Sequence, residues 1–107
     1  MTPIDDERER FALHAEICKV LTDPKRLMAL DALRGGERSV GELAAHLGTT
    51  LQNASQHLAV LRAAGLVAGR RTGTSVRYRL AEPTIVEACD VIHSIVERRL
   101  AGRSGAA

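Results

Sequence analysis

Apolar side chains recur at intervals of three and four residues along most of the chain, and this spacing predicts a mainly helical fold. A first helix is expected over residues 6–22. Asp23 and Pro24 end it and begin a second helix, because Asp is a good N-cap and Pro fits the first helical turn. This second helix is expected to run to about Arg34, where two glycines stop it. Its inward-facing residues are predicted to be Leu27, Leu30 and Leu33.

Two further helices are predicted in the middle of the chain. Ser39 and Glu42 have the spacing of a capping box, which starts a short helix over residues 40–47. A glycine ends this helix, and Thr49 or Thr50 can cap the helix that follows. The buried stripe of that fourth helix is predicted to comprise Leu51, Ala54, Leu58, Leu61 and Ala64.

Beyond the fourth helix the pattern changes from a helical to an alternating one. Residues 66–71 and 75–80 are expected to form the two strands of a half-buried β-hairpin, joined by a turn at 72–74. Pro83 opens a last helix that is expected to end at about Leu100. Two short helices joined by a tight turn and followed by a hairpin are typical of a winged helix-turn-helix. The predicted fold class is therefore mainly α with a β-hairpin (α+β).

The apolar surface of the last helix is too wide for one core to cover. We therefore expect this helix to have two partners, its own core and a second subunit of a homodimer. Residues 1–101 are predicted to form the winged helix-turn-helix domain with its dimerising helices, and residues 102–107 a flexible tail. The last helix has two apolar stripes. One comprises Ile85, Ala88, Ile92 and Ile95, and the other comprises Val86, Cys89, His93, Val96 and Leu100.

The net charge of +2 conceals an uneven distribution. The 39 residues from Leu43 to Ala81 contain five arginines and no Asp or Glu, so this stretch carries +5 and the rest of the chain −3. Such a segment favours binding to a polyanion. The only aromatic residues, Phe11 and Tyr78, argue against a protein that stacks single-stranded bases. An acidic, polar N-terminus and the lack of a long apolar run predict a cytoplasmic protein without a membrane partner.

The fourth helix exposes uncharged amide and hydroxyl side chains near its start, where helix-turn-helix proteins contact bases in the major groove. The hairpin adds arginines that suit phosphates or the minor groove. A polar face that is only solvated is the alternative. The predicted DNA contacts are Thr49, Thr50, Gln52, Asn53, Ser55, Gln56, His57 and Arg62 in the helix-turn-helix, and Arg70, Arg71, Thr74 and Arg77 in the hairpin.

Four segments in order, DPKRLMALDAL, SVGELAAHLG, QNASQHLAVLRAAGLV and RRTGTSVRYRL, resemble the ArsR/SmtB family of winged helix-turn-helix repressors. The resemblance covers about residues 12–100. It implies a homodimer whose interface is formed by the first and last helices. It also implies repression of transcription from a double-stranded DNA operator, with a response to an inducer. A two-fold symmetric dimer predicts a palindromic operator with half-sites about one helical turn apart.

The sensor sites known in this family match the sequence poorly. The segment VGELAAHLG has no Cys pair, Asp90 and His93 are only part of a zinc-type set, and Asp31 and Glu97 occupy the paired-thiol positions. Both cysteines nevertheless have a His four residues away, which places each pair on one helical face. They could hold zinc or another soft metal at the dimer interface, act as redox thiols, or be plain core residues. The two pairs are His14 with Cys18 and Cys89 with His93.

No catalytic function is predicted, because the sequence lacks a Ser-His-acid pattern, a phosphate-binding loop and a glycine-rich nucleotide motif. The expected function is a sequence-specific transcriptional regulator that responds to a metal ion or a thiol-reactive signal. The main alternative is a winged-helix module that binds proteins and senses no inducer. The uncharged recognition face beside the arginines favours DNA. The sequence names neither the operator nor the inducer.

Overall fold

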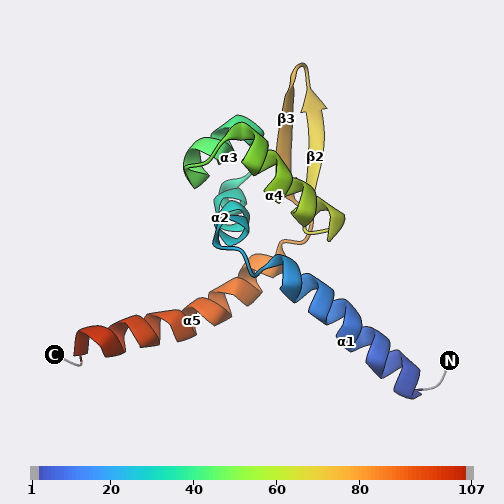
Figure 1. Cartoon of the computed structure of the whole chain (residues 1–107), viewed down its shortest axis with the longest axis vertical. Helices are drawn as coiled ribbons and strands as arrows, with labels where there is room; N and C mark the ends of the chain where they lie inside the picture. Colours follow the sequence, from blue (N-terminus) through green and yellow to red (C-terminus); the bar gives the residue numbers. More distant parts are fainter. Residues whose placement is uncertain (1–2, 106–107) are drawn as a thin grey trace.

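The computed structural model describes residues 3–105 and has a winged helix-turn-helix fold, mainly α with a β-hairpin (Figure 1). Within these residues no helix is both long and apolar enough to cross a membrane. The elements in chain order are α1 (Pro3–Val20), α2 (Pro24–Ala32), the 3-10 helix η1 (Leu33–Gly35), β1 (Arg38–Ser39), α3 (Val40–Leu47), α4 (Leu51–Ala63), β2 (Val67–Thr72), β3 (Ser75–Leu80) and α5 (Thr84–Gly105).

The helix starts follow the capping signals in the sequence. The Asp23 carboxylate accepts a hydrogen bond from the backbone N–H of Lys25 at 2.8 Å, which starts α2. At α3, the Ser39 hydroxyl accepts from the Glu42 N–H and the Glu42 carboxylate accepts from the Ser39 N–H, both at 3.1 Å. This confirms the predicted capping box.

The three strands form an antiparallel sheet in the order β1-β3-β2. The hairpin pairs Val67 with Leu80 at its base and Thr72 with Ser75 next to its tip. The hairpin prediction is confirmed, with the first strand shifted by one residue. The strand β1 is not predicted from the sequence, because a two-residue strand has no periodicity of its own.

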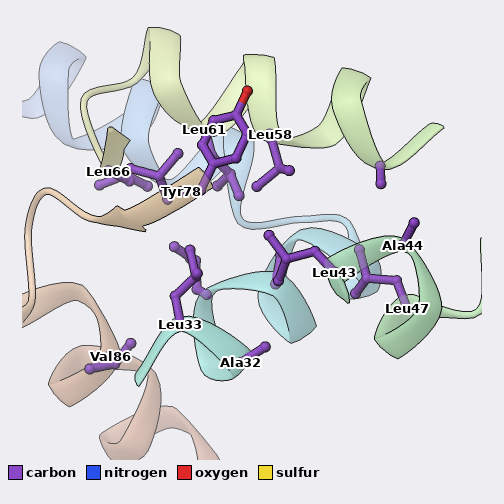
Figure 2. Packing of buried hydrophobic residues seen from close by; sticks show 14 residues of the cluster. Ala32, Leu33, Leu43, Ala44, Leu47, Leu58, Leu61, Leu66, Tyr78 and Val86 are labelled. Atoms are coloured by element: carbon purple, nitrogen blue, oxygen red, sulfur yellow. The ribbon is translucent and has the colours of Figure 1, made fainter. Parts of the chain in front are cut away.

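One apolar core holds α2, α3, α4 and the hairpin together. Among the side chains described, its 14 buried residues all lie between residues 29 and 86. Figure 2 shows side chains of α4 and β3 facing Leu33 of η1 and Leu43 of α3. Leu30, Leu43, Leu58 and Leu61 are the largest fully buried side chains. Residues 24–80, from α2 to β3, are called the body below.

The two longest helices, α1 and α5, extend from the body as separate arms, on the side away from the hairpin (Figure 1). Phe11 on α1 is 62% exposed, and Ile92 on α5 is 54% exposed. Val86, near the start of α5, is the only residue of either arm in the core among the side chains described. The arms therefore present apolar surface that the single chain does not cover.

Several predicted boundaries differ from the structure. The first helix spans Pro3–Val20 instead of 6–22, and the second ends at Ala32 and tightens into a 3-10 turn. The last helix continues to Gly105, so the part of the predicted tail that the structure describes is helical; residues 106–107 lie outside it.

Leu51 was expected in the buried stripe of α4, and this prediction is wrong. Its side chain is 56% exposed, whereas Ala54, Leu58 and Leu61 are buried. The spacing was correct for the helix, but the first turn of α4 lies outside the core. Burial begins one turn later, at Ala54.

Candidate nucleic-acid interface

A tight turn sets the angle between α3 and α4. Gly48 closes α3 in the left-handed conformation (φ 64°), which favours glycine, and its N–H bonds to the carbonyls of Ala44 and Ala45. Thr50 then caps α4, because its hydroxyl accepts from the Asn53 N–H at 3.1 Å. Only residues 48–50 separate the two helices, so the start of α4 is fixed relative to α3.

The predicted base-reading side chains share one face of α4, but they are not equivalent. The Asn53 side chain donates to the Thr49 hydroxyl at 3.3 Å, so both side chains have a local partner. Gln52, Ser55 and Gln56 are exposed, and their side chains make no hydrogen bond within the described part of the chain. Of the remaining predicted contacts in this helix, Arg62 is exposed and His57 is half-buried.

The hairpin is the wing of this fold, and two of its arginines already have partners. Arg70 and Arg77 lie directly opposite each other across the strands. Arg70 donates to both carboxylate oxygens of Glu37, at 3.0 and 2.8 Å. The Arg77 Nε donates to Glu37 Oε1 at 3.0 Å, and its Nη1 lies 3.5 Å from a carboxylate oxygen of Glu42. These predicted DNA contacts are therefore held by acidic groups in the free protein.

The other two wing residues predicted to contact DNA are Arg71 and Thr74. Both are exposed next to the tip, where Gly73 takes a positive φ of 62°. No ion pair to Arg71 occurs among the side chains described, those of residues 6–103. Arg71 is therefore more available to a phosphate than its neighbour Arg70.

The ion pairs of the wing also fix its charge state. Hydrogen bonds lower the pKa of Glu37, with the larger effect from Arg70 and the smaller one from Arg77. The Glu37 carboxylate in turn raises the pKa of Arg70. The capping hydrogen bonds from Ser39 lower the pKa of Glu42. The wing base is therefore a network of ionised groups at neutral pH, and it links the hairpin to the start of α3.

A second ion pair ties α5 to the body. The Arg34 guanidinium donates to both carboxylate oxygens of Asp90, at 2.9 and 2.8 Å, and to Asp31 at 3.2 Å. The hydrogen bond from Arg34 lowers the pKa of Asp90. Asp90, which partly matched a zinc-type set in the sequence, is thus a partner of Arg34.

The four candidate sensor residues do not form one site within a single chain. Cys18 is exposed on α1, and the His14 ring beside it stacks on Phe11 with centroids 6.4 Å apart. Cys89 is half-buried, and burial raises the pKa of its thiol. No group of three or more possible metal ligands occurs in the part of the chain described. A Cys₂His₂ site would therefore require a second subunit.

Cys89 instead faces a small cavity where α5 meets α2. The cavity has a volume of about 100 Å³, and Asp90 and His93 lie on its α5 side with Asp31 and Arg34 on the other. Its remaining lining residues are Leu27, Leu30 and Val86. The thiol is thus at the joint between an arm and the body.

Two residues of this surface were missed from the sequence. Glu37 lies outside the acid-free stretch, and its carboxylate contacts Arg70 and Arg77, which are 33 and 40 residues away in the sequence. No local pattern reveals contacts over such separations. Leu51 is exposed in the first turn of α4, although its helical spacing predicts burial.

Comparisons with known proteins agree with this geometry. Residues 23–68, from the start of α2 to the first part of β2, match the family described as bacterial regulatory protein, arsR family. The HTH-type transcriptional regulator Rv0081 of Mycobacterium tuberculosis is 42% identical over 87% of this chain and 82% of its own. The biofilm growth-associated repressor of Agrobacterium fabrum is 39% identical over 87% of this chain and 80% of its own.

Solved structures show the same fold. The homodimeric winged helix-turn-helix DNA-binding domain Mb0332 of Mycobacterium bovis is 32% identical, with a TM-score of 0.79 over 90% of this chain and 89% of that one. The crystal structure of Rv0081 has a TM-score of 0.75 and 38% identity over 96% of this chain and 98% of that one. The fold, the helix-turn-helix geometry and these matches together show that the chain belongs to the ArsR family of bacterial regulatory proteins.

Proposed function

We propose that this protein is a homodimeric repressor that recognises a palindromic double-stranded DNA operator. Family membership makes it a DNA-binding transcriptional regulator, not an enzyme. The observation that carries the finer proposal is the exposed face of α4, where Gln52, Ser55 and Gln56 have no partner within the described chain. Amide and hydroxyl groups of this kind suit base edges in the major groove.

In this proposal α4 enters the major groove, and the wing follows the neighbouring backbone or minor groove. Gln52, Asn53, Ser55 and Gln56 are the base-reading residues, since they occupy the N-terminal half of the helix. The exposed Leu51 could meet a thymine methyl group in the same groove. The residues assigned to the backbone or to neighbouring contacts are Thr49, Thr50, His57, Arg62, Arg71 and Thr74.

The arms support the dimer. Exposed apolar residues of α1 and α5 need a cover, and a second copy supplies matching surface under two-fold symmetry. The related Mb0332 domain is a homodimer. A two-fold dimer places two α4 helices on one face of a duplex, and it therefore requires two half-sites of opposite orientation.

Repression and its release are further parts of the proposal. A relative that is 39% identical is named a repressor. A change at Cys89 would act on the joint between α5 and α2, so zinc, another soft metal or a thiol-reactive compound bound there could alter the angle between the two halves of the dimer. His14, Cys18, Cys89 and His93 remain the candidate sensor residues, and burial raises the pKa of the Cys89 thiol, which lowers its thiolate fraction in the free protein.

The proposal is tested by selecting sequences from a random duplex library with the purified protein. We expect enrichment of a palindrome with half-site centres about 10 base pairs apart. Gln52→Ala should change the preferred base at one position of each half-site, whereas Arg71→Ala should weaken binding to all sequences alike. A protein that enriches no duplex sequence would contradict the proposal and favour a protein-interaction module.

The sensor part has its own test. Operator binding by the wild type and by Cys18→Ser and Cys89→Ser variants is measured with and without Zn²⁺, and with and without an organic persulfide. An effect of either reagent on the wild type that a variant loses supports a sensor at that cysteine. Identical behaviour of all three proteins would exclude a sensor role for both cysteines.

A further inference from the structure

Glu37 is placed where it can compete with DNA. It lies just before β1, and its carboxylate reaches across to the wing with only about a quarter of the side chain exposed (25%). One carboxylate serves two guanidinium groups, because Oε1 accepts from both Arg70 and Arg77. Glu37 is therefore built into the wing base.

The register of the hairpin explains why an acid is needed there. Arg70 and Arg77 are directly paired across β2 and β3, and like charges in such a pair destabilise a sheet. The Glu37 carboxylate bridges them and removes this repulsion. The same geometry places two positive charges opposite each other, one on β2 and one on β3. A duplex bound by the wing would lie against these two strands.

The bonds to Glu37 use the donors that a phosphate would need. Arg70 presents its Nε and Nη2 edge to the carboxylate, which is the bidentate arrangement that guanidinium groups also make with phosphate. All three nitrogens of Arg77 are engaged, by the Glu37 carboxylate, the Glu37 carbonyl and the Glu42 carboxylate. Neither arginine can bind a phosphate through these donors until the carboxylate is displaced.

We propose that Glu37 is an intramolecular competitor for DNA phosphate, which occupies the donors of Arg70 and Arg77 and so lowers the affinity for duplex of random sequence. This inference rests on the proposed function, in which the wing faces DNA. Phosphate contacts supply most of the affinity for random sequence, so sequestering two arginines lowers that background. Among the α4 residues, Gln52, Ser55 and Gln56 make no hydrogen bond to these arginines, so this competition acts on the phosphate contacts of the wing.

The test measures binding to a fluorescein-labelled 30-base-pair duplex of random sequence across a salt titration. Glu37→Gln removes the charge and keeps the size of the side chain. The matched control is Glu82→Gln, which makes the same change in net charge at an exposed residue beyond the base of the wing. Circular dichroism and thermal unfolding of each variant report whether the fold is kept.

We expect Glu37→Gln to bind the random duplex about five-fold more tightly than Glu82→Gln at moderate salt. The slope of log K against log salt for Glu37→Gln should be steeper by up to about 1.8, because each additional phosphate contact made by a freed arginine adds about 0.9. Equal affinities and slopes for the two variants, or weaker binding by Glu37→Gln, would overturn the inference. Weaker binding would mean that Glu37 positions the arginines for DNA.

A second measurement remains informative if Glu37→Gln loosens the wing. Arg70→Ala is made both in the wild type and in the Glu37→Gln background, and the loss of salt slope is compared. Competition predicts a larger loss in the Glu37→Gln background, by up to about 0.9. Equal losses in both backgrounds would overturn the inference. Absence of duplex binding by every protein, the wild type included, would instead overturn the proposed function.

Discussion

The body and the arms of this molecule differ in how they meet water. Nearly all of the core comes from the body, where Leu43, Leu58 and Leu61 are inaccessible. The arms keep Phe11 and Ile92 more than half exposed, although α1 and α5 are the longest helices described. Exposed apolar residues on long helices indicate surface meant for another chain. The body can therefore carry DNA recognition while the arms join two bodies.

The polar surfaces differ in the same way. The recognition face of α4 exposes amide and hydroxyl side chains without partners in the described chain, which leaves them available to bases. The charged groups at the wing base and at the joint with α5 are paired, Arg70 with Glu37 and Arg34 with Asp90. The ion pairs therefore hold the wing base and the α5 joint in one geometry, whereas the unpaired groups of α4 are available for recognition.

The largest expected effect comes from the body. Leu58→Ala removes a fully buried side chain and should lower the free energy of unfolding by about 3 kcal/mol. Urea denaturation followed by circular dichroism measures it. Leu51→Ala is the matched control on the same helix, because its side chain is 56% exposed, and it should cost less than about 1 kcal/mol. Equal losses would show that the first turn of α4 belongs to the core.

The next effect concerns the arms. Ile92→Asp places a charge on their apolar surface and should weaken dimerisation at least ten-fold, or about 1.4 kcal/mol. Sedimentation equilibrium gives the dimer dissociation constant. Ser94→Asp adds the same charge to an exposed polar position of the same helix and should have a smaller effect. A dimer that tolerates Ile92→Asp as well as Ser94→Asp would remove this face of α5 from the interface.

A smaller effect is expected at the wing tip. Arg71→Ala should reduce the salt slope of duplex binding by about 0.9, the loss of one phosphate contact, without changing base preference. Arg103→Ala removes an equal charge from the far end of α5 and should leave the slope unchanged. A change in base preference with Arg71→Ala would place this residue in a groove, against the prediction of a backbone contact.

The smallest effect is the pH dependence of the joint between arm and body. Arg34 lowers the pKa of Asp90 in the folded state, so this pair stabilises the fold above the ordinary Asp pKa of about 3.9. The contribution is lost as the pH falls below that value toward the folded-state pKa. Thermal unfolding of Asp90→Asn should therefore change less steeply with pH in this range than that of the wild type. Glu87→Gln on the same helix is the control, and parallel curves for Asp90→Asn and the wild type would contradict the assignment.

Local features of the fold could be predicted from the sequence, because caps and periodicity act within a few residues. The Ser39 capping box, the Thr50 cap and the hairpin follow from neighbouring side chains alone. The Glu37 bridge could not be predicted, since it depends on how the hairpin folds back over β1. The exposure of Leu51 was missed for a related reason: helical spacing identifies a face but not where the core along that face begins.

The residues of the candidate site likewise fall into those placed by one helix and those whose state depends on long-range contacts. Residues of α4 could be assigned to the recognition face because one helix carries them all. The state of the wing arginines depends on long-range ion pairs, and so Arg71 is a better candidate for a free phosphate contact than Arg70. Whether Cys18 and Cys89 meet depends on a second subunit, which neither periodicity nor a single chain determines.

The body is proposed to bind DNA and the arms to join two subunits. This assignment is tested most directly by binding to duplexes that carry one or two copies of the selected half-site. The wild type should prefer the two-site duplex by about 100-fold or more, because the arms link two bodies. Ile92→Asp, with its body still folded by circular dichroism, should bind both duplexes with similar affinity, close to that of the wild type for one half-site. A variant that loses the single half-site as completely as the pair would contradict the account.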